Sequence, residues 1–294
     1  MDAKSPSCAA QIEAPRKAES PRMRPLLELR DAQLAQVVGV MTDIDDTLTR
    51  HGALEASARK ALQDLAAAGV PVVAITGRPM GWSLAFMRPG AQRWPLHCIV
   101  AENGAVALLR EGDEVRLEYA QDEATRTANA TRLHNTLARI ELEVPGAARS
   151  RDSTGRITDI AIDHSEFTHL PGAAIDRVVA LMREAGMTAT VSSIHINGWF
   201  GTHDKLSGAR WMVQRLFGRA LDDEIGRWIY VGDSTNDQAM FAAFPLSVGV
   251  ANLTHFAQQL HTWPAFITQG ERGAGFAEVA ARVLAARAHG VQSK

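Results

Sequence analysis

Residues 37–49 combine the pattern of a buried strand with a dense cluster of carboxylates. The apolar, valine-rich run 37–41 leads directly to Asp43, Asp45 and Asp46. Short runs of this kind are typical of strands buried in a parallel sheet. The three acids then follow the carboxyl end of the strand, where open α/β sheets bind their ligands. Because neighbouring buried carboxylates repel one another, the loop is either a solvated polar loop or the site of a cation.

Strand-like and helix-like segments alternate before and after a central block of the chain. The expected core strands cover residues 37–42, 70–75, 97–101, 228–231, 246–250 and 265–268. The expected core helices cover residues 26–36, 55–68, 80–87, 204–217, 238–244 and 275–288. This order predicts an α/β fold with a doubly wound, mostly parallel, Rossmann-like core.

The central block has a different pattern, which predicts a smaller α+β unit with a mostly antiparallel sheet. Its expected strands cover residues 115–119, 157–162, 187–191 and 194–200, and its expected helices cover 122–142 and 171–185. Core elements lie on both sides of this block, so we expect an insertion. The predicted organisation is a disordered leader at 1–25, a core at 26–110 and 200–294, and the inserted unit at 111–199.

Composition favours an ordinary globular protein without a highly charged partner. Hydrophobic residues make up 46% of the chain, charged residues make up 22%, and the formal net charge is -2. We therefore expect neither nucleic acid nor membrane as a partner. Cys8 and Cys98 form no zinc-binding spacing, and the N-terminal residues lack the apolar stretch of a secretory signal. A cytoplasmic location is predicted.

The polar clusters that follow the core strands are expected to meet at one edge of the sheet, because parallel strands end on the same side. The residues concerned are Asp43, Asp45, Thr76, Gly77, Asp233 and Asp237. Oxygen-only ligands suit a hard cation such as Mg²⁺. A threonine hydroxyl and a glycine amide are both donors that can hold an anionic oxygen.

Lys205 lies at the start of an expected helix, where the helix dipole disfavours a cation. One interpretation is that Asp204 caps the helix and Lys205 points to solvent. The other is that a nearby anion holds the ammonium, and the acidic clusters favour this second interpretation.

Four motifs in order resemble those of the haloacid dehalogenase-like phosphohydrolases. They are DIDDT at 43–47, TGR at 76–78, Lys205, and GDSTND at 232–237. The insertion between the second and third motifs resembles the type IIB cap. That group includes Cof-like sugar phosphatases, sucrose-phosphate phosphatase and mannosyl-phosphoglycerate phosphatase. The resemblance extends from Val37 to the C-terminal helix.

The resemblance implies a role for each motif residue. Asp43 is the expected nucleophile, which forms an aspartyl-phosphate, and Asp45 is the expected general acid and base. Thr76, Gly77 and Lys205 are expected to bind the phosphate. The implied Mg²⁺ ligands are Asp43, the backbone carbonyl of Asp45, and Asp233. Asp237 is expected to complete or orient the ligand shell, directly or through water, with Asn236 in support.

Two further segments are candidates for substrate contact. Ser193, His195 and Asn197 alternate onto one face of an expected strand, which either reads sugar hydroxyls or is an exposed face without a ligand. Glu102 and Asn103 precede a glycine, so they either contact substrate or form a turn that needs positive φ.

The predicted function is a Mg²⁺-dependent phosphatase that acts on a small phosphorylated metabolite, with a sugar phosphate favoured by analogy with the relatives. One alternative is a phosphotransferase of the phosphomannomutase type, which passes the phosphoryl group to a second sugar hydroxyl. Another is a non-catalytic protein that senses a phosphometabolite. The presence of Asp43, Asp45, Lys205 and Asp233 disfavours this last alternative.

Overall fold

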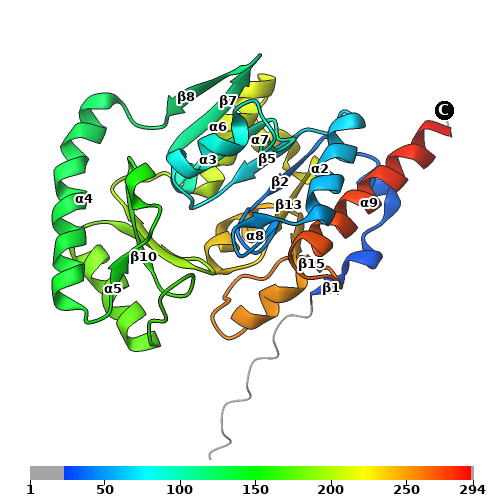
Figure 1. Ribbon diagram of the computed structural model, residues 1–294. Coiled ribbons are helices and arrows are strands. Elements are labelled where there is room, and N and C mark those ends of the chain that lie inside the picture. The colour runs from blue at the N-terminus through cyan, green and yellow to red at the C-terminus, as the bar shows by residue number, and fades with distance from the viewer. Residues whose placement is uncertain (1–22, 293–294) are drawn as a thin grey trace, which may run out of the picture.

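The computed structural model describes residues 23–292, and a nine-stranded sheet forms its centre (Figure 1). The strand order is β1-β15-β14-β13-β2-β5-β6-β7-β8. The pairs β6–β7 and β7–β8 are antiparallel, and the other neighbours are parallel. The strands are β1 (Arg24–Pro25), β2 (Gly39–Thr42), β5 (Val72–Ile75), β6 (Cys98–Ala101), β7 (Val106–Glu111), β8 (Glu114–Tyr119), β13 (Trp228–Gly232), β14 (Leu246–Gly249) and β15 (Phe266–Ile267). The predicted α/β fold with a mostly parallel core is confirmed.

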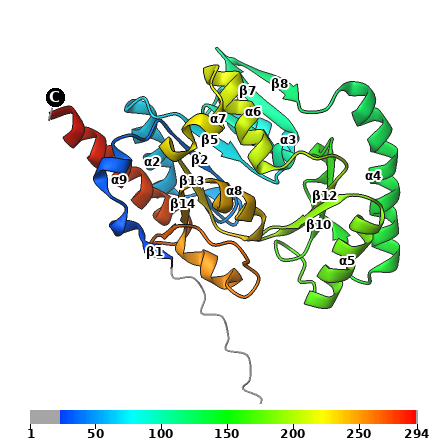
Figure 2. The ribbon, with the colours of Figure 1, turned by 180° about the vertical axis from the view of Figure 1, so that it is seen from behind.

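Helices cover both faces of this sheet, as Figures 1 and 2 show from opposite sides. One face carries α1 (Asp31–Leu34), α2 (Ala56–Ala67), α3 (Met80–Met87) and α9 (Arg272–Gln292). The other carries α6 (Lys205–Phe217), α7 (Leu221–Glu224) and α8 (Gln238–Ala243). Successive strand residues alternate between the two cores, so Val40 and Ile229 pack on the first, whereas Met41 and Tyr230 pack on the second. This burial on both faces explains the continuous apolar runs of the strands.

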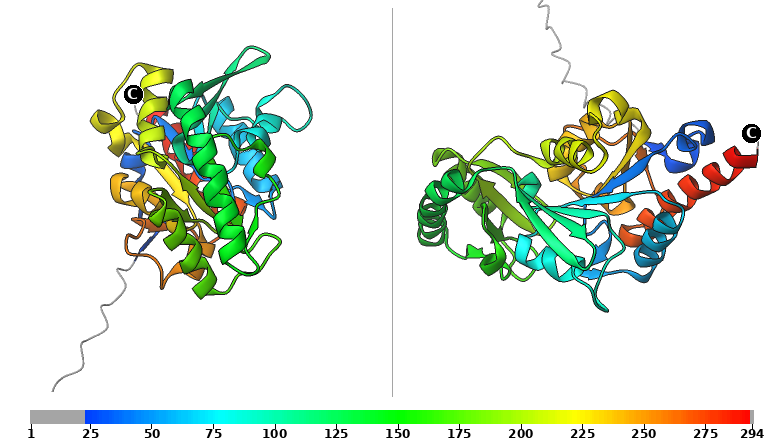
Figure 3. Two further views of the ribbon diagram at one scale, coloured as in Figure 1. Left: turned by 90° about the vertical axis from the view of Figure 1, so that its left-hand side faces the viewer. Right: turned by 90° about the horizontal axis from the view of Figure 1, so that it is seen from above.

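A second, four-stranded antiparallel sheet lies beside the core (Figure 3). Its order is β11-β12-β10-β9, and its strands are β9 (Ala148–Arg149), β10 (Asp159–Asp163), β11 (Thr188–Val191) and β12 (His195–Trp199). Two helices, α4 (Glu123–Glu143) and α5 (Gly172–Glu184), bury their apolar residues in a separate core that includes Ile140, Leu181 and Ile196. We call this sheet and these two helices the cap.

One strand expected in the cap lies in the main sheet instead. Residues 115–119 belong to β8, which pairs with β7, a strand that the sequence pattern did not reveal. The two strands form a hairpin around Gly112, whose φ is +65°. The cap therefore starts after Tyr119 and not at residue 111. The other proposed domain boundaries stay predictions.

The two chain segments that join the cap to the core are tied together. The first follows Tyr119, and the second follows Trp199. The Gln121 side-chain amide donates to the carbonyl oxygen of Phe200 at 2.7 Å, across the two segments. The cap is thus joined to the core along one edge.

The N-terminal segment differs from its prediction. The single helix expected over 26–36 is divided into a 3-10 helix at Leu26–Glu28 and α1, because Leu29 is extended with φ -68° and ψ 119°. Most of the predicted leader lies outside the described residues, but Arg24 and Pro25 pair with β15 and so belong to the core sheet. Within residues 23–292, no helix is both long and apolar enough to cross a lipid bilayer. The cytoplasmic location stays a prediction.

Candidate active site

The site lies where β2, the central strand, ends between β13 and β5. The Asp43 amide donates to the carbonyl oxygen of Val231 at 2.9 Å, which continues the β2–β13 pairing by one residue. This pairing places Asp43 beside the start of the loop that follows β13. Residues far apart in the sequence meet here because the strands are parallel, as the sequence predicted.

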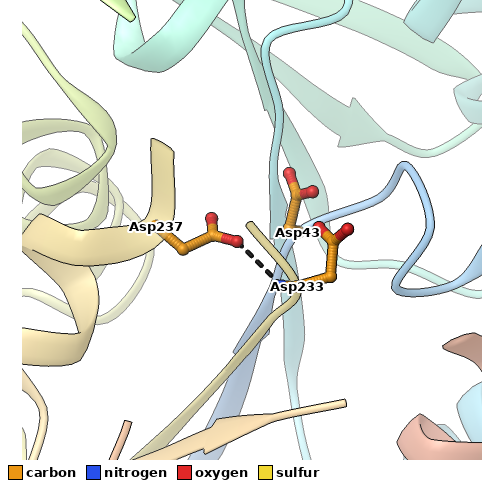
Figure 4. A group of neighbouring side chains, drawn as sticks. All are labelled: Asp43, Asp233 and Asp237. Carbon is orange, nitrogen blue, oxygen red and sulfur yellow. Dashed lines mark hydrogen bonds between the residues drawn. The ribbon is translucent and has the colours of Figure 1, made fainter. Parts of the chain in front are cut away.

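Three buried aspartates form the centre of the site (Figure 4). One carboxylate oxygen from each of Asp43, Asp233 and Asp237 lies within 4.8 Å of the others. Figure 4 shows that Asp43 and Asp233 present their carboxylates side by side, whereas Asp237 reaches toward them from the turn before α8.

The Asp237 carboxylate is fully used by protein donors. Its Oδ2 atom accepts from the backbone amides of Asp233 at 2.9 Å and Ser234 at 3.1 Å. Its Oδ1 atom accepts from the Tyr230 hydroxyl and from Lys205 Nζ. Asp237 therefore holds the loop and the lysine in place.

Lys205 points into the acidic cluster and not into solvent. Asp204 does cap α6, since its side chain accepts from the Ser207 amide at 2.7 Å. The Lys205 side chain is only 3% exposed, and its Nζ lies 2.8 Å from Asp43 Oδ1 and 2.6 Å from Asp237 Oδ1. Burial alone would lower the pKa of Lys205, but Asp237 and Asp43 raise it above its usual value. The ammonium is therefore charged.

One ammonium does not balance three buried carboxylates. Burial raises the pKa of Asp43 to about 7, although Lys205 opposes this shift. Burial, followed by Asp43 and Asp237, raises the pKa of Asp233 well above its usual range. The nearest donors to the Asp233 carboxylate are distant, with Thr47 Oγ1 at 3.4 Å and Asn252 Nδ2 at 3.5 Å. An all-oxygen set with two uncompensated charges fits a divalent, oxygen-preferring cation such as Mg²⁺.

Asp45 has a different partner from Asp43. Arg78 Nε lies 2.9 Å from Asp45 Oδ2, and Arg78 Nη2 lies 2.9 Å from Asp45 Oδ1. A planar guanidinium is suited to bind both oxygens of one carboxylate in this way. The pairing fixes the orientation of Asp45 beside the cleft.

Arg78 also contacts the cap. Its Nη1 lies 3.1 Å from Asp152 Oδ2, and its Nη2 lies 2.7 Å from Glu166 Oε1. Glu166 in turn lies 2.9 Å from His195 Nε2. No role for Arg78, Asp152 or Glu166 was predicted from the sequence. The two cap acids lie in loops without a recognisable motif, so the sequence carried no signal for them.

Thr76 and Gly77 lie under the junction between core and cap. Thr76 is fully buried, and its Oγ1 accepts from the Arg78 amide at 3.0 Å. A Cβ atom on Gly77 would lie 3.2 Å from Asn197 Oδ1, so the cap approaches closely here and a larger residue would press on the Asn197 side chain. The Gly77 carbonyl oxygen accepts from Arg156 Nη1 at 2.9 Å.

Glu102 has its carboxylate occupied by the protein, which contradicts its expected contact with substrate. It is fully buried, and its oxygens accept from the backbone amides of Met80, Ile157 and Thr158 at 3.0, 3.1 and 2.6 Å. Glu102 and Asn103 have φ values of +50° and +54°, so the turn geometry expected for this segment is present. Asn103 is buried beside Gly77, and its Nδ2 atom has no hydrogen-bond partner within the described part of the chain.

The polar residues of β12 face the seam between cap and core and not solvent. His195 and Asn197 are 2% and 1% exposed. Asn197 Nδ2 donates to Asp159 Oδ2 at 3.1 Å and to the Gly77 carbonyl oxygen at 3.3 Å. The exposed-face interpretation is therefore wrong, and Asn197 helps to fasten the cap to the core. In the described part of the chain, Asn236 makes a local contact, since its Oδ1 accepts from Ser234 Oγ at 3.0 Å.

A cavity of about 260 Å³ opens between the core loop and the cap. Asp45, Arg78 and His51 line it from the core, and Ser165, Glu166 and Ser193 line it from the cap. Its volume lies near the lower end of the range for small-molecule sites. The cavity suits a small polar molecule that meets both parts of the protein.

Comparisons with known proteins identify the same family as the motifs. Residues 40–144 match the family model described as haloacid dehalogenase-like hydrolase. No curated protein matches the sequence. A HAD/COF-like hydrolase of Plasmodium vivax has a similar structure at 16% identity and a TM-score of 0.63, over 87% of this chain and 99% of that chain. The sucrose-phosphatase of Synechocystis has a TM-score of 0.61 at 16% identity, over 84% of this chain and 98% of that chain.

These similarities extend through both the core and the cap, and the ordered motifs meet at one site in the fold. The shared fold agrees with the predicted resemblance to the type IIB, Cof-like group. Residues 40–144 thus match the haloacid dehalogenase-like hydrolase family model, and the fold of core and cap together is shared with the two structures named above.

Proposed function

We propose that this hydrolase is a Mg²⁺-dependent phosphatase that cleaves a small phosphate monoester through an aspartyl-phosphate on Asp43. The observation that carries this proposal is the convergence of Asp43, Asp233 and Lys205 within one buried cluster. Phosphoryl transfer to a carboxylate requires a nucleophile and nearby positive charges. Asp43 would supply the nucleophile, and Lys205 and a bound cation would supply the charges.

Each residue has a chemical task in the proposed reaction. The Asp43 carboxylate attacks phosphorus and displaces the leaving alkoxide. Asp45 donates a proton to that alkoxide and then takes one from the water that cleaves the aspartyl-phosphate. Lys205, Thr76 and the Gly77 amide hold the phosphoryl oxygens, where negative charge is concentrated.

Mg²⁺ would be held by Asp43, Asp233 and the backbone carbonyl of Asp45. When bound, it supplies positive charge that offsets the charge of the phosphoryl group. Asp233 fits this task because it is fully buried and its nearest donors lie at 3.4 Å or more. Asp237 would support the site by orienting Lys205 and the 233–234 backbone.

A sugar phosphate is the proposed substrate class. The cavity between core and cap is small and lined by polar side chains, which suits a compact hydroxylated molecule. The Synechocystis structure, which shares the fold, is described as a complex with sucrose and phosphate. Among the predicted substrate contacts, Asn103 and His195 remain proposals, and we assign Glu102 and Asn197 to fastening the cap.

The test is phosphate release from a panel of sugar phosphates and other phosphomonoesters, with and without Mg²⁺. We expect turnover that requires the metal and that falls by about 10³-fold or more in Asp43→Asn. Asp222→Asn is the matched control, because Asp222 is exposed and pairs with Arg210 on the surface.

The outcome of this panel also separates the alternatives. A phosphotransferase would release little inorganic phosphate and would form an isomeric sugar phosphate. A binding protein would retain ligand without turnover. Equal phosphate release by the wild type and Asp43→Asn would contradict the assignment of the nucleophile.

A further inference from the structure

A second hollow lies at the opposite edge of the core sheet from the candidate active site. It has a volume of about 600 Å³ and lies against α2, β7 and the segment between α3 and β6. His97, which lines it, immediately precedes β6, whereas the active site follows the carboxyl ends of the strands. The lining residues used in the argument are Arg59, Arg93, Trp94, His97 and Arg110.

The described residues that line the hollow include three arginines but no acidic residue. Within residues 23–292, Arg59, Arg93 and Arg110 form no ion pair with a carboxylate. Some exposed arginines elsewhere are paired, as Arg210 is with Asp222 at 3.0 Å, whereas others in the described part of the chain, such as Arg88, are not.

Arg110 has a hydrogen-bond donor without a partner in the described part of the chain. Its Nη2 donates to the Trp94 carbonyl oxygen at 3.2 Å, but its Nε atom is buried and has no partner within the described part of the chain. Burial, followed by the charge of Arg93, lowers the pKa of Arg110. Burial, followed by the charge of Arg110, lowers the pKa of His97. These groups disfavour one another's charges, and a bound anion would remove that penalty.

We propose that this hollow is a binding site for a small polyanion, such as a diphosphate or a phosphorylated metabolite. Guanidinium groups match phosphate oxygens with paired hydrogen bonds, and several arginines around one space favour a ligand with two or more negative charges. The volume accommodates a molecule of nucleotide size. This site is independent of the proposed phosphatase function.

A chain of packed rings leads from this hollow to the candidate active site. Trp94 stacks on Phe86 with ring centroids 4.4 Å apart, and Phe86 meets Trp82 at 4.6 Å. The guanidinium of Arg78 lies over the Trp82 ring at 5.0 Å. Since Trp94 is part of the wall of the hollow, a bound polyanion is expected to change tryptophan fluorescence.

The experiment is calorimetric titration of the full chain with pyrophosphate in EDTA, so that metal-dependent binding at the active site is suppressed. We expect one Arg-dependent binding event whose affinity falls about tenfold or more in Arg93→Gln/Arg110→Gln. Arg210→Gln is the matched control and should bind as the wild type does. Citrate, titrated in parallel, separates a general polyanion site from one specific for phosphate.

Arg93→Gln alone guards against misfolding, because the Arg93 side chain is exposed. We expect this variant to keep its near-ultraviolet circular dichroism and its phosphate release while it loses affinity for pyrophosphate. Unchanged affinity for both anions in the double variant would overturn the proposal. A lack of phosphate release by the wild type would contradict the proposed function and leave this site unaffected.

Discussion

The guanidinium of Arg78 binds both oxygens of the Asp45 carboxylate, with Arg78 Nε 2.9 Å from Oδ2 and Nη2 2.9 Å from Oδ1. The same guanidinium reaches Glu166 of the cap at 2.7 Å. Arg78 is only 4% exposed, so these contacts are made away from bulk water, where charged hydrogen bonds are stronger. One side chain thus joins the proposed acid–base residue to the cap.

Arg78→Lys is expected to lower kcat/KM by about 10²-fold, because lysine keeps the charge but lacks the planar fork that orients Asp45. Phosphate-release kinetics measure this effect. The control is Arg88→Lys, since Arg88 is an exposed residue that follows α3, the helix that Arg78 precedes. Wild-type kinetics in Arg78→Lys would show that a positive charge at this position is sufficient to orient Asp45.

Glu166→Gln is expected to lower the free energy of unfolding by about 2 kcal/mol at pH 7. Burial alone would raise the pKa of Glu166, but the neighbouring His195 and Arg78 side chains lower it to about 2. A lowered pKa means that this stabilisation is complete above about pH 4.5 and is lost as the pH falls toward 2. Urea titrations between pH 7 and pH 3 should show the two proteins converging in acid. A constant difference at every pH would contradict the role of the ionised carboxylate.

Mg²⁺ is expected to stabilise the protein against heat, by about 2.7 kcal/mol when its free concentration is a hundred times the dissociation constant. Asp233→Asn should abolish this gain. The variant should also be more stable than the wild type in EDTA, because it removes one of three repelling buried carboxylates. Thermal unfolding with and without the metal measures both effects. An equal gain from Mg²⁺ in the wild type and the variant would place the metal elsewhere.

Lys205→Met is expected to cost about 3–5 kcal/mol of stability, because it leaves Asp43 and Asp237 buried without their shared ammonium. The double variant Lys205→Met/Asp237→Asn should recover part of that loss, since one buried charge is removed with its partner. It should not recover phosphate release, because the donor to the phosphoryl oxygens is still absent. Recovery of activity together with stability would mean that Lys205 serves only the fold.

The alternation of strands and helices was sufficient to predict the core and the centre of the site. Parallel strands end at one edge, so Asp43 and Asp233 could be brought together from sequence alone, although 190 residues separate them by their numbering. The bounds of α3, Met80–Met87, were also predicted, because helix-breaking prolines flank this short apolar segment.

Contacts made across the fold were not predictable in the same way. The pattern of residues 115–119 indicates a strand but does not specify its partner, and β7 turned out to pair with it. Glu102 precedes a turn, yet its hydrogen-bond partners include Ile157 and Thr158, more than 50 residues away. Arg78 lies in a recognised motif, but its cap partners depend on how the two parts dock.

The hydrogen bond between Gln121 and Phe200 has a consequence for how the cap can move relative to the core. Because the two connecting segments are hydrogen-bonded to each other, we expect them to move together when the cap moves relative to the core. Any opening of the cap also has to break its other contacts with the core, which include Arg78 with Glu166 and Asn197 with the Gly77 carbonyl oxygen.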